Sequence, residues 1–139
     1  MEIIEYEIRH KEQLEQIYLN SRQDAFEWMD TSHYQLSDFS KDTQGERIWV
    51  AEDAKQVLGF VAIWQADHFI HHLYVDKPVY RRGVGEKLIK MLSDLYEKPL
   101  GLKCLCKNER AIQFYYSQGF KTISQGEDDL GKYFFMQLD

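Results

Sequence analysis

The sequence has only two cysteines, Cys104 and Cys106, among its 139 residues. On a strand, residues separated by one position share a face and lie about 6.5–7 Å apart along the chain, which is a poor geometry for a disulfide. We therefore expect two reduced, partly buried thiols. No C-x-x-C pattern accompanies them, and the sequence predicts no metal site.

The sequence also lacks a long apolar run and an excess of positive charge. No stretch approaches the ~18 apolar residues of a membrane-spanning helix, and no basic segment precedes an apolar one at the N-terminus. The net charge is −6, whereas non-specific nucleic-acid binding needs a basic surface. These absences predict a cytoplasmic protein that binds neither membranes nor nucleic acid. With 44% hydrophobic residues, the chain fits one globular domain over residues 1–139.

The N-terminal half predicts a strand, a helix and a β-hairpin. Residues 3–8 alternate as a strand does, and residues 11–24 place apolar side chains at helical spacing. Residues 48–52 and 57–64 form two β-like runs around a turn. The irregular segment 25–47 between them is either a short helix with loops or a lid that faces a substrate.

The C-terminal half predicts strands that alternate with helices. An amphipathic helix follows a glycine-rich turn, and Asn108 is a good N-cap for a second helix that ends at Gly119. An acidic loop, 126–129, is expected to join the last two strands. The order is β-α-β-α-β-β, which predicts a mixed α/β fold whose central sheet is mostly antiparallel and flanked by helices. The expected elements are strands 68–75, 100–106, 120–124 and 132–138, and helices 84–95 and 109–118.

A glycine-rich turn with basic residues lies between the predicted strand 68–75 and the helix that follows. Residues 80–85 read Tyr-Arg-Arg-Gly-Val-Gly. Free backbone N–H groups at a helix N-terminus bind phosphate groups, and glycine allows a ligand to approach the backbone closely. No Gly-Lys-Ser/Thr follows, and a third glycine is missing, so the turn is neither a P-loop nor a dinucleotide fingerprint. It predicts a site for a pyrophosphate, to which either Arg81 or Arg82 adds charge.

A second motif connects this turn to a known family. Residues 108–120 read Asn-Glu-Arg-Ala-Ile-Gln-Phe-Tyr-Tyr-Ser-Gln-Gly-Phe, and they match every fixed position of N-x-x-A-x-x-F-Y-x-x-x-G-F. With Leu-Tyr-Val-Asp at 73–76 and the glycines at 83 and 85, the chain resembles the GNAT superfamily of N-acetyltransferases. Tyr80 departs from the Gln or Arg of the family's first signature. This departure leaves open which arginine reaches the phosphates.

The resemblance implies a GNAT-like fold and acetyl-CoA as cosubstrate. In this family the cofactor lies in a V-shaped split between the fourth and fifth strands, here residues 68–76 and 100–106. The strand is expected to pair with the pantetheine, the glycine turn to hold the pyrophosphate, and the second helix to border the thiol. The residues implied as cofactor contacts are Leu73, Tyr74, Val75, Arg81, Arg82, Gly83, Val84, Gly85, Glu86, Asn108 and Phe114.

The resemblance also places Tyr115 where the family has its general acid. A phenol there would protonate the leaving thiolate, and the alternative is an aromatic residue of the core. For the general base we consider Glu52, which ends a strand, and the histidine pair at 71 and 72. Because neighbouring strand residues face opposite sides, only one histidine is expected at the split, and His72 is retained. Asp76 is a further candidate, and a water chain is an alternative.

The acceptor pocket is expected to involve residues 20–47 and the last hairpin, with Arg22, Trp28, Tyr34 and Phe39 as candidates. The alternative is that the aromatic residues simply pack this segment onto the sheet. The predicted function is acetyl transfer to a primary amine of a small molecule or peptide. A non-catalytic module that binds acyl-CoA for regulation is the alternative. Homodimers are common in the family.

Overall fold

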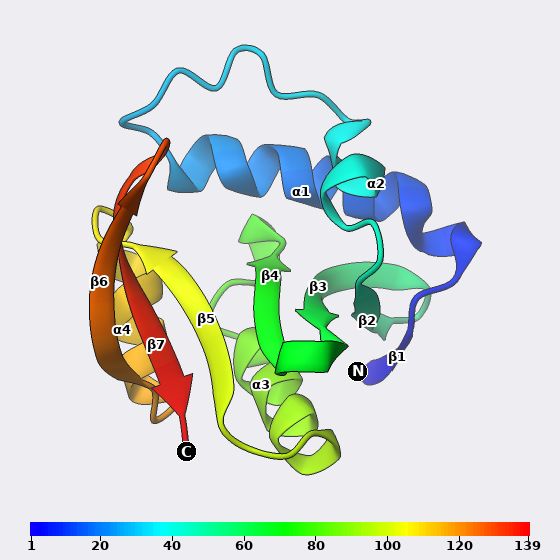
Figure 1. Ribbon diagram of the computed structural model, residues 1–139. Helices are drawn as coiled ribbons and strands as arrows, with labels where there is room; N and C mark the ends of the chain where they lie inside the picture. Colours follow the sequence, from blue (N-terminus) through cyan, green and yellow to red (C-terminus); the bar gives the residue numbers. More distant parts are fainter.

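The computed structural model describes residues 1–139, which form a seven-stranded sheet covered by helices on both faces (Figure 1). The sheet order is β1-β2-β3-β4-β5-β7-β6, and only the β4–β5 pair is parallel. This arrangement confirms the predicted mixed, mostly antiparallel sheet. The strands are β1 (Glu2–Glu5), β2 (Arg47–Asp53), β3 (Gln56–Trp64), β4 (Phe69–Val75), β5 (Leu100–Leu105), β6 (Lys121–Asp128) and β7 (Gly131–Leu138).

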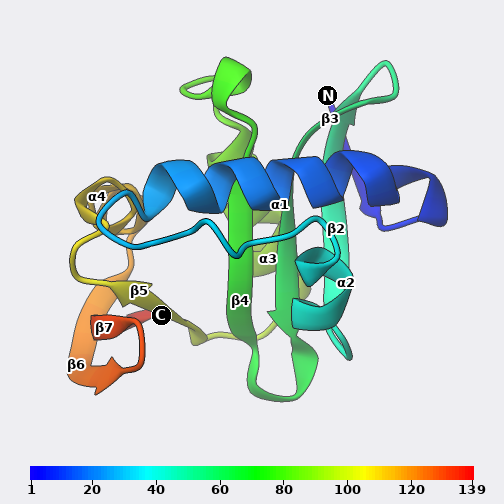
Figure 2. The same cartoon turned by 90° about the horizontal axis from the view of Figure 1, so that it is seen from above.

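The helices divide between the two faces of the sheet (Figure 2). Apolar residues recur at helical spacing in α1 and α3, so each helix buries one side against the sheet. One core lies between the sheet and α1 and α2, and the other lies between the sheet and α3 and α4. No helix is both long and apolar enough to span a membrane. The helices are α1 (Lys11–Ala25), α2 (Asp38–Asp42), α3 (Val84–Leu95) and α4 (Glu109–Ser117), with short 3₁₀ turns at Ile8–His10, Gln65–Asp67 and Lys77–Val79.

Three local predictions need correction. The first strand ends at Glu5, because residues 8–10 form a 3₁₀ turn in which Glu7 and His10 cap one another. The residues predicted as an acidic loop mostly extend β6, which runs to Asp128 and pairs with β7 through Asp128↔Gly131. The alternation predicted for His71 and His72 is wrong as well. A β-bulge in β4 is the cause, since Ala62 pairs with His72 while Ile63 pairs with Ile70.

Phe39 lies in the core under α1 and is 2% exposed. Its ring packs against Tyr18, Phe60 and Tyr6 with ring centroids 5.5–6.2 Å apart. Phe39 therefore packs its segment onto the sheet and does not line an acceptor pocket.

We expect Phe39→Ala to lower the free energy of unfolding by about 3–5 kcal/mol, because it leaves a cavity in a closed aromatic cluster. Leu36→Ala is the control, since Leu36 is exposed, and it should change stability by less than about 0.5 kcal/mol. Chemical denaturation with urea measures both values. A Phe39→Ala protein as stable as the control would contradict the role of this cluster.

Candidate functional site

The central feature of the candidate site is the separation of β4 from β5. The two strands pair only through Phe69↔Gly101 and Ile70↔Leu102, and beyond these residues they diverge (Figure 1). Each strand keeps its other neighbour, because β3 pairs with β4 as far as Gly59↔Val75 and β7 pairs with β5 as far as Leu105↔Tyr133. The divergence leaves a V-shaped split whose β4 edge has backbone groups free to pair with an extended ligand.

The glycine turn lies at the N-terminus of α3, downstream of β4. Gly83 is the N-cap with φ +79°, a left-handed conformation that favours glycine, and a Cβ at this position would meet no atom within 4 Å. The first intrahelical bond is donated by Lys87 N–H to Gly83 C=O, so the N–H groups of residues 84–86 precede it. Arg81 and Arg82 are exposed beside these donors. The chemistry of this turn suits a phosphate group.

Helix α4 is held against this turn by two contacts. A Cβ on Gly85 would lie 2.9 Å from Cζ of Phe114, so glycine is needed for α3 to approach the ring so closely. The guanidinium of Arg110 stacks 4.1 Å from the centre of the Tyr80 ring. The side chain of Asn108 accepts a hydrogen bond from Ala111 N–H and caps α4, as predicted. The starts of the two helices are thus fixed relative to one another.

Two phenols, one buried and one partly buried, lie close enough to a buried thiol in the β4–β5 region for the three groups to influence one another electrostatically. Tyr115 from α4 is 8% exposed, and burial raises its pKa well above the usual value of about 10, with Cys104 and Tyr74 adding to the effect. Burial also raises the pKa of Tyr74 and raises that of Cys104 to about 12. All three groups therefore keep their protons at neutral pH. Both cysteines are free thiols, as predicted.

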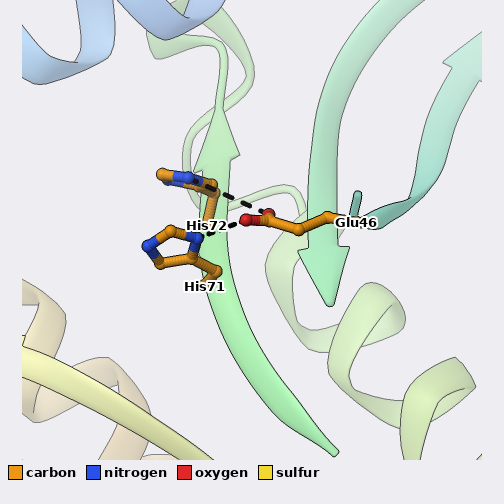
Figure 3. A group of neighbouring side chains, drawn as sticks. All are labelled: Glu46, His71 and His72. Atoms are coloured by element: carbon orange, nitrogen blue, oxygen red, sulfur yellow. Dashed lines mark hydrogen bonds and ion pairs between the residues drawn. The ribbon is translucent and has the colours of Figure 1, made fainter. Parts of the chain in front are cut away.

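Glu46 meets both histidines of β4 at the bulge (Figure 3). Its carboxylate pairs with Nδ1 of His71 and lies 4.0 Å from Nε2 of His72. His71 is the extra residue of the bulge, so its ring can lie on the same side as that of His72, with centroids 4.1 Å apart. The contact with Glu46 raises the pKa of His71. Burial, with a smaller effect of His71, lowers the pKa of His72 to about 4.

Glu52 lies in β2 and is engaged in an ion pair. Arg9 donates to its two oxygens at 3.0 and 2.8 Å, and Nε2 of His10 lies 3.1 Å from Oε2. Glu7 N–H donates to Nδ1 of His10, so the ring of a neutral His10 carries its proton on Nε2 and donates to Glu52. The hydrogen bonds from Arg9 lower the pKa of Glu52. Both oxygens of this candidate base are therefore occupied.

Arg22, another of the acceptor candidates, is enclosed by aromatic rings and acidic side chains. It is 6% exposed, and its guanidinium lies 3.8 Å from the centre of the Tyr18 ring and 4.2 Å from that of Tyr34. It also donates to Asp38 at 3.2 Å. Trp28 packs edge-on against Phe26 in the segment between α1 and α2. These contacts hold the segment over the α1 face of the sheet.

Sequence reasoning missed Glu46 and Arg110. Glu46 is 25 residues from His71 in the chain, and no short-range spacing connects them. Only the position of Glu46 at the end of the segment 20–47, which is expected to border the acceptor pocket, could have suggested that it borders the site. Arg110 lies within the second family-like motif, but at a position that the pattern leaves free.

The comparisons with known proteins agree with this geometry. A family model described as "Acetyltransferase (GNAT) domain" matches residues 44–122. Among curated proteins, peptidyl-lysine N-acetyltransferase YiaC of Escherichia coli (strain K12) is 35% identical over 75 residues, which are 54% of this chain and 50% of YiaC. The match thus spans about half the length of that relative.

Solved structures share the fold over nearly the whole chain. The apo form of YjaB from Escherichia coli superposes with a TM-score of 0.78 at 22% identity, covering 98% of this chain and 95% of YjaB. An N-acetyltransferase from Staphylococcus aureus Mu50 gives 0.83 at 14% identity, covering 99% and 100%. PaiA N-acetyltransferase from Thermoplasma acidophilum, solved with coenzyme A, gives 0.78 at 17% identity, covering 99% and 98%. These likenesses confirm the predicted GNAT-like fold.

The ion pair of Glu52 generates a prediction about stability and pH. Because its pKa is lower in the folded than in the unfolded protein, Glu52 stabilises the fold above the unfolded pKa of about 4.3, and this stabilisation is lost as the pH falls through the folded value. We therefore expect Glu52→Gln to lower the melting temperature by several degrees at pH 7 and by progressively less below about pH 4.

Glu7→Gln is the matched control, since Glu7 pairs with the same Arg9 at an exposed position, where ion pairs contribute little. Thermal unfolding followed by circular dichroism between pH 3 and 7 measures both variants. A loss of stability in Glu52→Gln that stays constant over this range would show that the ion pair does not contribute as described.

Proposed function

Because the chain belongs to the GNAT acetyltransferase family, we propose that it transfers an acetyl group from acetyl-CoA to a primary amine of a small molecule or peptide. The observation that carries the proposal is the β4–β5 split together with the glycine turn downstream of β4. The split offers an extended backbone edge, and the turn offers helix N–H groups and two exposed arginines. A pantetheine arm and a pyrophosphate require these two features.

In the proposed complex, each part of the chain has one task. The edge of β4 at 73–75 pairs with the pantetheine, and residues 81–86 hold the pyrophosphate. Asn108 and Phe114 border the split from α4. The contact between Phe114 and Gly85 supports these assignments, because it keeps α4 next to the glycine turn.

The bound cosubstrate supplies a thioester whose carbonyl carbon forms a C–N bond with the amine as its C–S bond breaks. Tyr115 is proposed to donate its phenolic proton to the leaving sulfur. The phenol carries the proton that this role needs, because burial raises its pKa and keeps it neutral at physiological pH. The phenol regains a proton from solvent after the products leave.

The amine must lose a proton, and we retain His72 and Glu52 as candidates for its acceptor. His72 lies in β4, the strand that borders the split, and its Nε2–H donates to the Asp42 carbonyl oxygen at 3.3 Å, so Nδ1 is the ring nitrogen that can accept a proton. Glu52 is held by Arg9 and His10 in β2. Position therefore favours His72.

The acceptor is proposed to enter over the segment between α1 and β2. YiaC is described as a peptidyl-lysine N-acetyltransferase, so lysine-containing peptides are the first acceptors to test, followed by small primary amines. Release of free thiol from acetyl-CoA separates transfer from the alternative of a regulatory module. Cofactor binding without thiol release across the amine panel would favour that alternative.

The role of the glycine turn predicts that the basic pair contributes to cofactor affinity. We expect Arg81→Ala/Arg82→Ala to weaken CoA binding by at least about 10-fold, because charge-assisted hydrogen bonds to phosphate contribute about 1.5–3 kcal/mol. Lys11→Ala is the control, an exposed cation at the start of α1, and should leave the affinity unchanged. Isothermal titration with CoA provides the measurement. Equal affinities of the double variant and the control would remove the arginines from the site.

The role of Tyr115 predicts a selective loss of turnover. Tyr115→Phe keeps the buried ring but removes the proton donor, so we expect kcat to fall by about 100-fold or more with CoA affinity changed by less than about two-fold. Tyr116→Phe is the matched control. Its hydroxyl bonds to Thr122 at the surface, 2.8 Å away, and its removal should not alter the rate. An unchanged kcat for Tyr115→Phe would exclude Tyr115 as the acid.

A further inference from the structure

Glu46, His71 and His72 form a compact group of metal-ligating side chains at the bulge of β4 (Figure 3). One ligand atom from each lies within 4.8 Å of the others. The three residues come from two separate segments, since Glu46 directly precedes β2 while both histidines lie in β4. The fold therefore brings together a set of donor atoms that no sequence motif predicts.

One oxygen of the Glu46 carboxylate lacks a hydrogen-bond partner. Its side chain is only 3% exposed, and its Oε1 is buried without a hydrogen-bond partner. Burying a carboxylate oxygen without a partner costs free energy, because its hydrogen bonds to water are lost and no hydrogen bond within the protein replaces them. Nε2 of His72 lies 4.0 Å from it, which is too far for a hydrogen bond. A cation between these atoms would satisfy the oxygen.

We propose that Glu46, His71 and His72 bind a zinc ion. Two imidazoles and one carboxylate are a ligand set that zinc accepts, with bonds of about 2.0–2.2 Å and ligand atoms therefore about 3.3 Å apart in a tetrahedral site. The observed separations, 4.8 Å or less, require movements of about 1 Å, which side-chain rotation provides. Magnesium and calcium prefer oxygen ligands and do not fit this set.

The contacts that the histidines make now are replaceable. Nδ1 of His71 pairs with Glu46, and Nε2 of His72 has a long contact of 3.3 Å with the Asp42 carbonyl oxygen. Zinc would take the place of both contacts and neutralise the Glu46 charge. The side chain of His71 is half exposed, so a fourth position faces solvent and can hold water. The geometry therefore corresponds to an open, three-residue site.

The proposal is tested by metal binding to the tag-free protein, in the absence of acetyl-CoA. We expect isothermal titration with zinc chloride to show one site with a dissociation constant in the micromolar range or tighter, and magnesium to show no binding. Cobalt(II) as a zinc substitute should give visible absorption bands typical of four-coordinate sites. Zinc should also raise the melting temperature, since a ligand that binds only the folded state stabilises it.

The variants separate this site from other zinc ligands. Glu46→Gln keeps the shape of the side chain but removes the charge, and His71→Ala removes one imidazole at a half-exposed position. Each should weaken zinc binding at least about 10-fold and abolish the cobalt bands. His33→Ala is the control, an exposed histidine outside the group, and should bind as the unmodified protein does.

Two results would overturn the proposal. One is the absence of saturable binding at about 100 μM zinc by the folded, unmodified protein. The other is binding that persists in both Glu46→Gln and His71→Ala, which would place the ion elsewhere. Loss of such persistent binding in Cys106→Ser would identify the thiols as its ligands. Because the measurements contain no acetyl-CoA or amine, their outcome does not depend on the proposed transfer reaction.

Discussion

The divergence of β4 from β5 is the constraint on which the rest of the structure depends. Two strands in the middle of a sheet stop pairing after Ile70↔Leu102, although unpaired backbone groups in a protein interior are costly. The split can persist because β4 stays paired with β3 and β5 stays paired with β7 along their lengths. Gly59 contributes to this, since a Cβ there would lie 2.7 Å from the Tyr74 carbonyl oxygen. Close β3–β4 pairing therefore needs glycine at this position.

The two cores hold the split open from opposite faces. Leu73 and Val75 pack with the core of α3 and α4, whereas Tyr74 packs with the core of α1 and α2. Consecutive residues of β4 thus fasten this strand to both layers at once. Helix α4 approaches from the α3 side and carries Tyr115, whose pKa is raised by burial and further by Cys104 of β5 and Tyr74 of β4.

The sequence could predict most of the elements and the local turns and caps between them, because these depend on patterns within a few residues. The glycine turn, the Asn108 cap and Gly119 act within a few residues of themselves, and the structure has them as expected. The bulge at His71 was not predictable, since it arises from the register between two strands. The contact of Glu46 with the two histidines was not predictable for the same reason, because only the folded sheet brings Glu46 to β4. The extension of β6 through Asp128 shows pairing with β7 overriding the low strand propensity of acidic residues.

The two proposals assign His72 roles that exclude each other. A neutral imidazole has one nitrogen lone pair, which can accept a proton from an amine or bind a metal ion but cannot do both at once. If both proposals hold, a zinc ion on Glu46, His71 and His72 would remove the favoured proton acceptor and slow acetyl transfer while leaving the glycine turn free to bind CoA. The two proposed sites use different residues, since the turn lies at the start of α3 and the bulge lies within β4. Cofactor affinity and metal affinity would then report on two independent parts of one split.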